Sequence, residues 1–239
     1  MTVEEFSDGF DTLVSSYRRF RDFDKKEPVD TVEFDEYEKS LYLTKAQEEL
    51  VLSLYDGKNS FGDTFEGTEE MRRFLSDLVV DADLTPVTAP ANISGVSSNS
   101  KFFQLPDDLW FITYEAAKVS DAACEGMMNQ DVIPVRQDEY HKIKRNPFRG
   151  TTARRALRLD ITSNMVEVVS KQTVSGYSIR YMKRLQPIIL EKLPNELTIN
   201  GISTLSPCQL HPALHQRILE MAVNRALHSK GLYTNNENN

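Results

Sequence analysis

The stretch FFQLPDDLWFITYEAAKV, residues 102–119, decides how the middle of this 239-residue chain folds. From Trp110 to Glu115 the side chains form two alternating sets, one of Trp, Ile and Tyr and the other of Phe, Thr and Glu. Because successive side chains of a strand point to opposite faces, this alternation predicts a β-strand. Asp107 and Asp108 precede the strand, and we interpret them as a solvated turn rather than a catalytic carboxylate pair.

Similar strand-like runs recur after this stretch and indicate a β-rich region. The connections between them are too short for helical crossovers, so the sheet is predicted to be mostly antiparallel. The segment TPVTAPANISGVSSNSK (85–101) is rich in Pro, Ser, Gly and Asn and is predicted to be a loop or strand-linking insertion. The further runs are VIPV (132–135), RRALRLDI (154–161), NMVEVVS (164–170), SGYSIRYM (175–182) and PIIL (187–190).

Helical patterns precede the β-rich region. Residues 2–20 carry apolar side chains at helical spacing, and Thr2 and Glu5 fit a capping box at the start. Residues 68–84 begin as a helix and are expected to continue into a strand at DLVV (77–80).

A longer helical stripe lies within residues 33–59, and Gly57 stands where a C-terminal cap belongs. Thr44 and Gln47 repeat the capping-box pattern inside this stripe. Two short helices and one bent helix both fit the pattern. The apolar stripe consists of Leu43, Ala46, Leu50 and Leu54.

Helix returns at residues 211–231, with Pro212 near the first turn and Gly231 as the stop. The last residues, LYTNNENN, include Leu232 and Tyr233 but have no apolar periodicity, so a flexible tail is predicted. One face of the helix consists of Leu214, Ile218, Met221 and Ala222.

These elements predict an α+β fold in which N- and C-terminal helices pack together and an antiparallel β-rich region lies between them in the sequence. The expected parts are a helical part at 1–83 and a β-rich part at 84–205. A C-terminal helix at 206–230 would complete the helical part, and a flexible tail would follow at 231–239.

The composition is that of a folded protein, with 40% hydrophobic and 27% charged residues. The apolar runs fall short of the ~20 residues that a membrane helix needs, and the acidic N-terminus is unlike a signal peptide. We therefore expect a soluble protein of the cytoplasm, with no membrane partner. Cys124 and Cys208 form no motif, which favours reduced thiols.

Positive charge is concentrated in residues 136–158, where eight basic residues and two acidic ones give +6. The total is −8, so the rest of the chain carries −14. This acidic balance favours protein partners over non-specific DNA coating. Three interpretations stay open: pairing within the chain, an interface with acidic surfaces of other subunits, and contact with DNA. The candidate partner-binding residues are Lys142, Lys144, Arg145, Phe148, Arg149, Arg154 and Arg155.

Enzyme signatures are missing from the sequence: it has no phosphate-binding loop, nucleophile elbow or dinucleotide fingerprint. Cys208, His211 and His215 have a spacing that zinc could accept, but no fourth ligand is evident. A buried Cys and two histidines near a helix terminus are the preferred interpretation, with a metal enzyme as the minor alternative. We predict no catalytic residue, no cofactor and no metal.

Several segments, taken in order, resemble a structural protein of crAss-like phages that infect gut Bacteroidales. The resemblance covers residues 36–226, and the layout is similar to head-to-tail connector proteins of tailed phages. The segments that carry it are EYEKSLYLTKAQEELVLSLYDG, LPDDLWFITYE, VRQDEYHKIKRNPFRG, RRALRLDI, YSIRYMKRLQPIIL and SPCQLHPALHQRILEMAVNRAL. The two helical motifs are matched by Leu43, Ala46 and Gln47, and by Pro212, Leu214, His215, Ile218, Leu219, Ala222 and Val223.

The resemblance implies a virion protein without enzymatic activity that forms a ring, typically of twelve copies, beneath the portal. The ring would join the portal to the tail around a continuous DNA channel, after assembly in the bacterial host cytoplasm. Its implied partners are further copies of the chain, the portal, other connector or tail ring proteins and packaged DNA. The two apolar helix faces, with Leu232 and Tyr233, would serve helical packing or portal docking.

A DNA-binding packaging or regulatory factor is the alternative that the basic run leaves open. It predicts strongly salt-dependent DNA binding and absence from virions. The ring interpretation predicts presence in virions. The sequence does not decide which ring layer the chain would form or which of its faces would line a channel.

Overall fold

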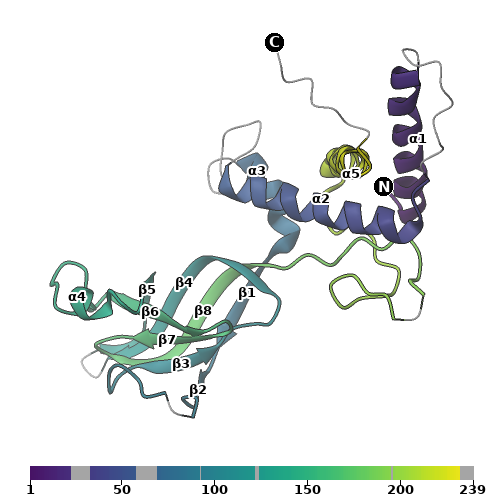
Figure 1. Ribbon diagram of the computed structural model, residues 1–239. Coiled ribbons are helices and arrows are strands. Elements are labelled where there is room, and N and C mark those ends of the chain that lie inside the picture. Colours follow the sequence, from purple (N-terminus) through teal and green to yellow (C-terminus); the bar gives the residue numbers. More distant parts are fainter. Residues whose placement is uncertain (23–32, 58–68, 92, 122–123, 195, 232–239) are drawn as a thin grey trace. The chain divides into compact units, whose positions relative to one another are not determined.

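The computed structural model divides the chain into two units (Figure 1). The helical unit comprises residues 1–78 and 185–239, and the sheet unit comprises residues 79–184. The mixed α+β class predicted from the sequence is confirmed. The limits expected for the β-rich part were 84 and 205, whereas the contacts group 79–83 with the sheet and 185–205 with the helices. The structure describes residues 1–22, 33–57, 69–91, 93–121, 124–194 and 196–231.

The helical unit is built from capped helices. Thr2 and Glu5 form the predicted capping box, because each side chain accepts the other residue's backbone N–H. Asp35 and Glu38 form a second box, and Gly57 adopts the left-handed C-cap conformation at φ 75°. The elements are α1 (Val3–Asp22), α2 (Glu36–Asp56), α3 (Glu69–Leu75), the 3-10 turns η1 (Ser76–Leu78) and η2 (Pro212–Leu214), and α5 (His215–Ser229).

Helix α2 is continuous, so Thr44 and Gln47 do not begin a second helix. They are buried in mid-helix and bind the backbone of Gln186 and Ile188. The Ile188 N–H donates to the Thr44 hydroxyl at 3.1 Å, and the Gln47 amide donates to the Gln186 carbonyl at 2.6 Å. A polar stripe on the helix thus satisfies the backbone of an extended segment.

The prediction of a strand at Pro187–Leu190 is wrong, because the backbone of this segment also binds side chains of α2. This described segment makes only an isolated bridge, between Ile189 and Ser206. The Leu190 N–H donates to the Ser40 hydroxyl of α2 at 3.0 Å, so helix side chains replace a neighbouring strand. The apolar residues of this segment suggested a strand. Its backbone hydrogen bonds, however, are made with a helix that is distant in the sequence.

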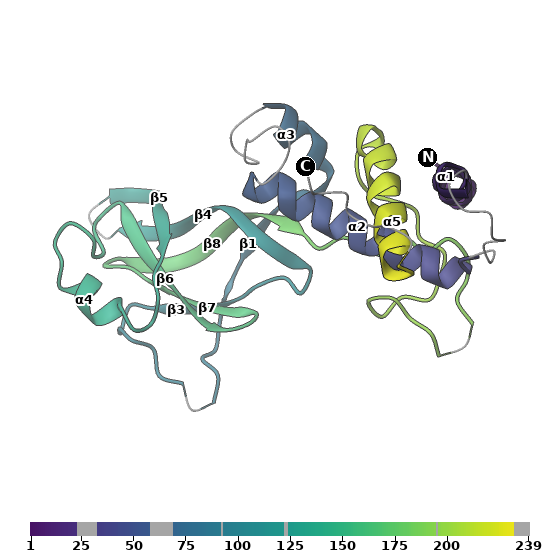
Figure 2. The ribbon, with the colours of Figure 1, turned by 45° about the horizontal axis from the view of Figure 1, so that its top comes forward.

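Helix α2 contacts both α1 and α5 within the helical unit. Figure 2 shows α5 crossing α2. The buried Lys39 ammonium binds the Asp11 carboxylate of α1 at 2.7 Å. Tyr42 shares a 2.7 Å hydrogen bond with Ser229 at the end of α5, and Lys230 pairs with Glu38 at 3.1 Å. These polar contacts flank the buried apolar faces of the helices.

The sheet unit is one eight-stranded sheet with the order β1-β8-β4-β5-β6-β7-β3-β2. The sheet is mostly antiparallel, as predicted, but β5 and β6 run parallel. Their connection contains α4 (Tyr140–Lys144), a short crossover helix. The strands are β1 (Val79–Leu84), β2 (Pro86–Val87), β3 (Lys101–Gln104), β4 (Leu109–Asp121), β5 (Cys124–Pro134), β6 (Arg155–Thr162), β7 (Met165–Val169) and β8 (Thr173–Lys183).

Strands β1 and β2 form the two edges of this sheet, yet only Thr85 separates them in the chain. The first pairs with β8 and the second with β3. The sheet must therefore curl until its two edges are joined by one continuous stretch of backbone. The insertion predicted at 85–101 is the segment that starts with β2 and ends at the start of β3.

Alternation along the strands divides the sheet into an inner and an outer face. Ala156 and Val168 belong to the inner core, whereas their neighbours Leu157 and Val169 pack on the outer face against Tyr140 of α4. The remaining buried members of the inner core are Phe103, Leu105, Ala117, Val119, Val132, Val166, Val174, Tyr177, Ile179 and Tyr181.

Among the described residues, no helix combines the length and the apolar character that crossing a bilayer requires.

Candidate interaction surface at the basic loop

Most of the sequence-predicted basic residues lie together in the β5–β6 crossover, residues 140–155, which we call the basic loop. Tyr140 anchors it, because its buried side chain packs on Leu157 and Leu159 of β6. The Asn146 carboxamide oxygen accepts the Phe148 N–H at 2.9 Å, and the Gly150 N–H donates to the Asn146 carbonyl at 2.8 Å. These bonds form a compact turn.

The turn presents an exposed aromatic side chain within a basic segment. Phe148 is 85% exposed, the highest value among the exposed large hydrophobic side chains of the described residues. Arg155 is the half-buried member of the set, and its guanidinium donates to the Phe148 carbonyl. This hydrogen bond stabilises the turn. The exposed basic side chains are Lys142, Lys144, Arg145, Arg149 and Arg154.

Within the chain as described, Lys142, Arg145, Arg149 and Arg154 have no ion-pair partner. Lys144 differs, since its ammonium lies 5.7 Å from the centroid of the Tyr140 ring. Pairing within the chain, one of the three interpretations of the basic run, therefore does not account for these four cations.

Arg158, the last cation of the run, does have partners within the chain. Its guanidinium lies 3.0 Å from both carboxylate oxygens of Glu115, and each side chain is only 12% exposed. The Tyr177 hydroxyl donates to the same carboxylate. Burial raises the pKa of Glu115, while the charge of Arg158 and the Tyr177 hydrogen bond act in the opposite direction. This cluster holds β4, β6 and β8 together.

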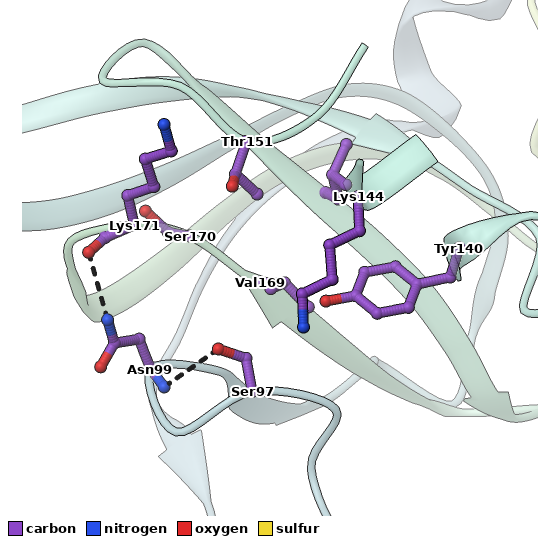
Figure 3. Close-up of a pocket in the computed structure, with 9 residues that line it drawn as sticks. Ser97, Asn99, Tyr140, Lys144, Thr151, Val169, Ser170 and Lys171 are labelled. Carbon is purple, nitrogen blue, oxygen red and sulfur yellow. Dashed lines mark hydrogen bonds between the residues drawn. The ribbon is translucent and has the colours of Figure 1, made fainter. Parts of the chain in front are cut away.

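A cavity of about 210 Å³ lies beside the basic loop (Figure 3). Lys144 and the hydroxyl end of Tyr140 lie close together on one side of it, and the Asn99 amide donates to the Lys171 carbonyl at 3.2 Å. Ammonium and hydroxyl donors are the groups that bind carboxylate or phosphate oxygens. The lining residues are Ser97, Asn99, Tyr140, Lys144, Thr151, Leu157, Val169, Ser170 and Lys171.

The residues considered for zinc make other contacts. His211 Nδ1 accepts the Ala213 N–H at 3.3 Å, as the cap of η2. His215 is buried, and its Nε2 lies 2.9 Å from the Leu210 carbonyl oxygen. Burial lowers the pKa of His215 and raises that of Cys208. No group of three or more potential metal-ligating His, Cys, Asp or Glu side chains occurs among the described residues.

Comparison with known proteins identifies the family. A family model described as "Phage tail ring protein 3/4" matches residues 1–238. The chain belongs to this family. Ring protein 3 of Bacteroides phage crAss001 is 45% identical over 241 residues, which cover 99% of this chain and 100% of that protein. Ring protein 4/5 of the same phage is 31% identical over 235 residues, covering 95% of this chain and 92% of that protein.

In this member of the phage tail ring protein 3/4 family, the apolar helix residues named from the sequence lie in the core of the helical unit. All are buried except the half-buried Met221, so in this conformation they pack within the chain. Leu232 and Tyr233 lie outside the described residues, and docking on them stays a prediction. The set is Leu43, Ala46, Leu50, Leu54, Leu214, Ile218, Met221 and Ala222.

Sequence reasoning missed the contribution of the 85–101 insertion to this side of the sheet. Ser97 and Asn99 line the cavity beside the basic loop, and the Val96 N–H donates to Glu167 of β7 at 2.7 Å. A signal was available in NMVEVVS, where Glu167 is the one charged residue of an apolar strand. A charge in such a place indicates a specific partner.

Proposed function

We propose that this chain is a structural component of the phage tail or head-to-tail connector, without enzymatic activity, and that its copies assemble into a ring. The match to a tail ring family over residues 1–238 supports this proposal. So do two relatives, both named ring proteins, that align over nearly their whole length. In the virion, the partners of the ring are other phage ring proteins.

The finer proposal places the ring beneath the portal, with twelve copies around a continuous DNA channel. The protein would assemble in the bacterial host cytoplasm and remain at the head–tail junction of the virion. A closed ring needs two different surfaces on each copy, one that contacts the next copy and one that receives the previous copy. The separation of basic and acidic charge in this sequence suits such head-to-tail pairing.

The observation that carries the proposal is the group of unpaired cations on the basic loop. Arg145, Arg149 and Arg154 are exposed, as is Phe148, and the three arginines have no carboxylate partner in the described chain. Arginine and aromatic side chains are enriched in protein interfaces, where they often carry much of the binding energy. We therefore propose that the basic loop contacts an acidic surface of a neighbouring subunit.

A DNA-binding role is the second candidate, favoured by the same exposed Phe148 among cations. Aromatic rings can stack on bases, and cations neutralise phosphates. The two candidates differ in location and in salt dependence. A ring protein that contacts an acidic protein surface would be present in virions at fixed stoichiometry. A DNA-binding packaging factor would be absent from virions.

Quantitative mass spectrometry of purified virions, calibrated against the portal protein, tests the proposed function first. Near-equal stoichiometry of chain and portal is expected for a twelve-copy ring. Absence from virions would overturn the ring proposal and favour the DNA-binding factor.

A charge variant then tests the basic loop. Changing Arg145, Arg149 and Arg154 to Gln is expected to prevent ring formation, observed by electron microscopy and analytical ultracentrifugation. A control variant that changes Lys45, Lys101 and Lys192 to Gln removes the same charge at exposed positions elsewhere. Equal ring formation by both variants and the wild type would rule out the basic loop as the subunit contact.

A further inference from the structure

The outer face of the sheet contains a buried carboxylate with an unused acceptor. Glu167 of β7 is 0% exposed and lies in register between Phe102 of β3 and Leu159 of β6. Its Oε1 accepts the Val96 N–H at 2.7 Å. Its Oε2 is buried and has no hydrogen-bond partner within the described structure.

Such an arrangement is energetically unfavourable unless something else binds there. An ionised carboxylate in an apolar environment strongly favours a nearby positive charge or hydrogen-bond donor. The two cross-strand neighbours, Phe102 and Leu159, offer neither. Most buried polar atoms of native proteins have partners, so an unpartnered one indicates either a ligand or a group held neutral.

Glu167 lines a cavity of about 360 Å³, separate from the one in Figure 3 although Tyr140 borders both. Aliphatic side chains and the Tyr140 ring form much of its wall, and among the described lining residues Glu167 is the one acidic side chain. The exposed residues Ser94, Gln137 and His141 form the side that faces solvent. The aliphatic lining residues are Ile93, Val96, Leu159 and Ile161.

We propose that this cavity binds the ammonium group of a lysine side chain presented by a neighbouring protein subunit, with Glu167 as its counter-ion. The aliphatic wall suits the four-carbon stem of lysine, which packs on apolar surface while its charge binds a polar group. Tyr140 adds an aromatic ring to the lining, and aromatic rings are favourable neighbours for a cation. The choice of a neighbouring subunit rests on the proposed ring function.

The geometry favours lysine over arginine. A guanidinium binds a carboxylate best through both oxygens, in a forked arrangement. At Glu167 one oxygen is already taken by the Val96 N–H, which leaves a single acceptor. A compact ammonium needs only one acceptor oxygen. Glu167 lines the cavity, and the segment around Val96 beside it is exposed loop.

The binding step can be tested on the isolated chain, whatever its role in a ring. The probe is Nα-acetyl-lysine N-methylamide, titrated while the methyl NMR signals of Ile93 and Ile161 are followed. The norleucine analogue has no ammonium and the arginine analogue carries a guanidinium. We expect saturable binding of the lysine probe, at least tenfold tighter than either analogue. Equal affinity for lysine and norleucine probes would overturn the proposal, because it would show that charge plays no part.

The matched variants are Glu167→Gln and Glu139→Gln. The first keeps an acceptor for the Val96 N–H but puts an amide donor in place of Oε2. The second makes the same change at an exposed residue that precedes Tyr140 in the sequence. A tenfold or greater loss of affinity is expected for E167Q alone. Unchanged binding by E167Q would refute the role of this carboxylate. If E167Q failed to fold, the comparison of the three probes on the wild type would still decide.

The source of the lysine is tested in assembled particles by carbodiimide cross-linking and mass spectrometry. The reagent activates a carboxylate, an amine displaces the resulting urea, and an amide bond remains. An amide between Glu167 and a lysine of a neighbouring subunit is expected. Probe binding without that cross-link would overturn the assignment to a neighbouring subunit and favour a free amine. Failure of the ring proposal would appear separately, as absence of the chain from virions.

Discussion

Arg154 and Arg158 lie four residues apart in one basic run, yet the fold uses them in different ways. Arg158 lies on the inner face of β6 and binds Glu115 of β4. Arg154 precedes β6, is exposed and has no acidic partner within the described chain. Arg158 therefore stabilises the fold, whereas Arg154 is available to bind another molecule. Charge density along the sequence does not make this distinction.

The largest expected effect is on stability, at the buried member of the pair. Arg158→Met should lower the free energy of unfolding by about 3–5 kcal/mol, because it leaves Glu115 as a buried charge without its counter-ion. Urea denaturation followed by circular dichroism measures this change. Arg154→Met is the matched control and should stay within about 0.5 kcal/mol of the wild type. Similar losses in the two variants would contradict the distinction.

Removing the hydroxyl that shares this carboxylate should have a smaller effect. Tyr177→Phe deletes the donor to Glu115 while keeping the buried ring, so a loss of about 1.5–3 kcal/mol is expected for a hydrogen bond to a charged group. The same denaturation measurement applies. Tyr114→Phe, at an exposed tyrosine of the same β4 strand as Glu115, is the control, and its stability should be unchanged. An unchanged free energy of unfolding in Y177F would mean that Arg158 alone stabilises the Glu115 carboxylate.

The pH dependence of the Arg158→Met variant sharpens the comparison further. Burial raises the pKa of Glu115 above its ordinary value of 4.5. The folded chain therefore binds this proton more tightly than the unfolded chain does. The stability gained from protonation is lost as pH rises through the raised pKa. Loss of Arg158 removes an influence that lowers this pKa. The stability gap between variant and wild type should therefore be wider at pH 7 than at pH 5, by about 1.4 kcal/mol for each unit of added shift.

Denaturation at the two pH values measures this difference. A gap that stays constant would indicate that Glu115 does not titrate differently in the variant. Adding Glu115→Gln to the variant should abolish the pH-dependent part.

The smallest expected effect on stability is at the exposed cations. Changing Arg145, Arg149 and Arg154 together to Gln should alter the free energy of unfolding by no more than about 0.5 kcal/mol, since none of the three has an ionic partner in the described structure. Thermal denaturation measures the change. A loss of more than 1 kcal/mol would show that these cations stabilise the chain and would weaken the interface proposal.

Local patterns predicted most elements of this fold but not their partners. Alternation from Trp110 to Glu115 correctly indicated β4, and Gly57 correctly marked the end of α2. The parallel pairing of β5 with β6 was missed because it depends on where a short crossover helix packs. Thr44 was misassigned because its hydrogen-bond partner, Ile188, lies far away in the sequence.

The residues of the candidate site were also predicted without their partners. The sequence identified the basic run, and the structure confirms that most of its cations are exposed. It did not separate Arg158 from the others, because Glu115 reaches it only through the sheet. The cavity at Glu167 was also missed, since its walls come from the insertion, α4 and two strands. A single acidic residue in an apolar strand was the only local sign.

The register of the sheet also has a consequence for how such a chain can diversify. Val79, where the sheet unit begins, pairs with Met182, almost at its end. The backbone therefore enters and leaves this unit at neighbouring points on adjacent strands. A segment with adjoining ends can be lengthened, exchanged or deleted while the flanking chain keeps its own fold. Residues 79–184 thus have the geometry of a segment that can be exchanged without moving the points at which the flanking chain meets it.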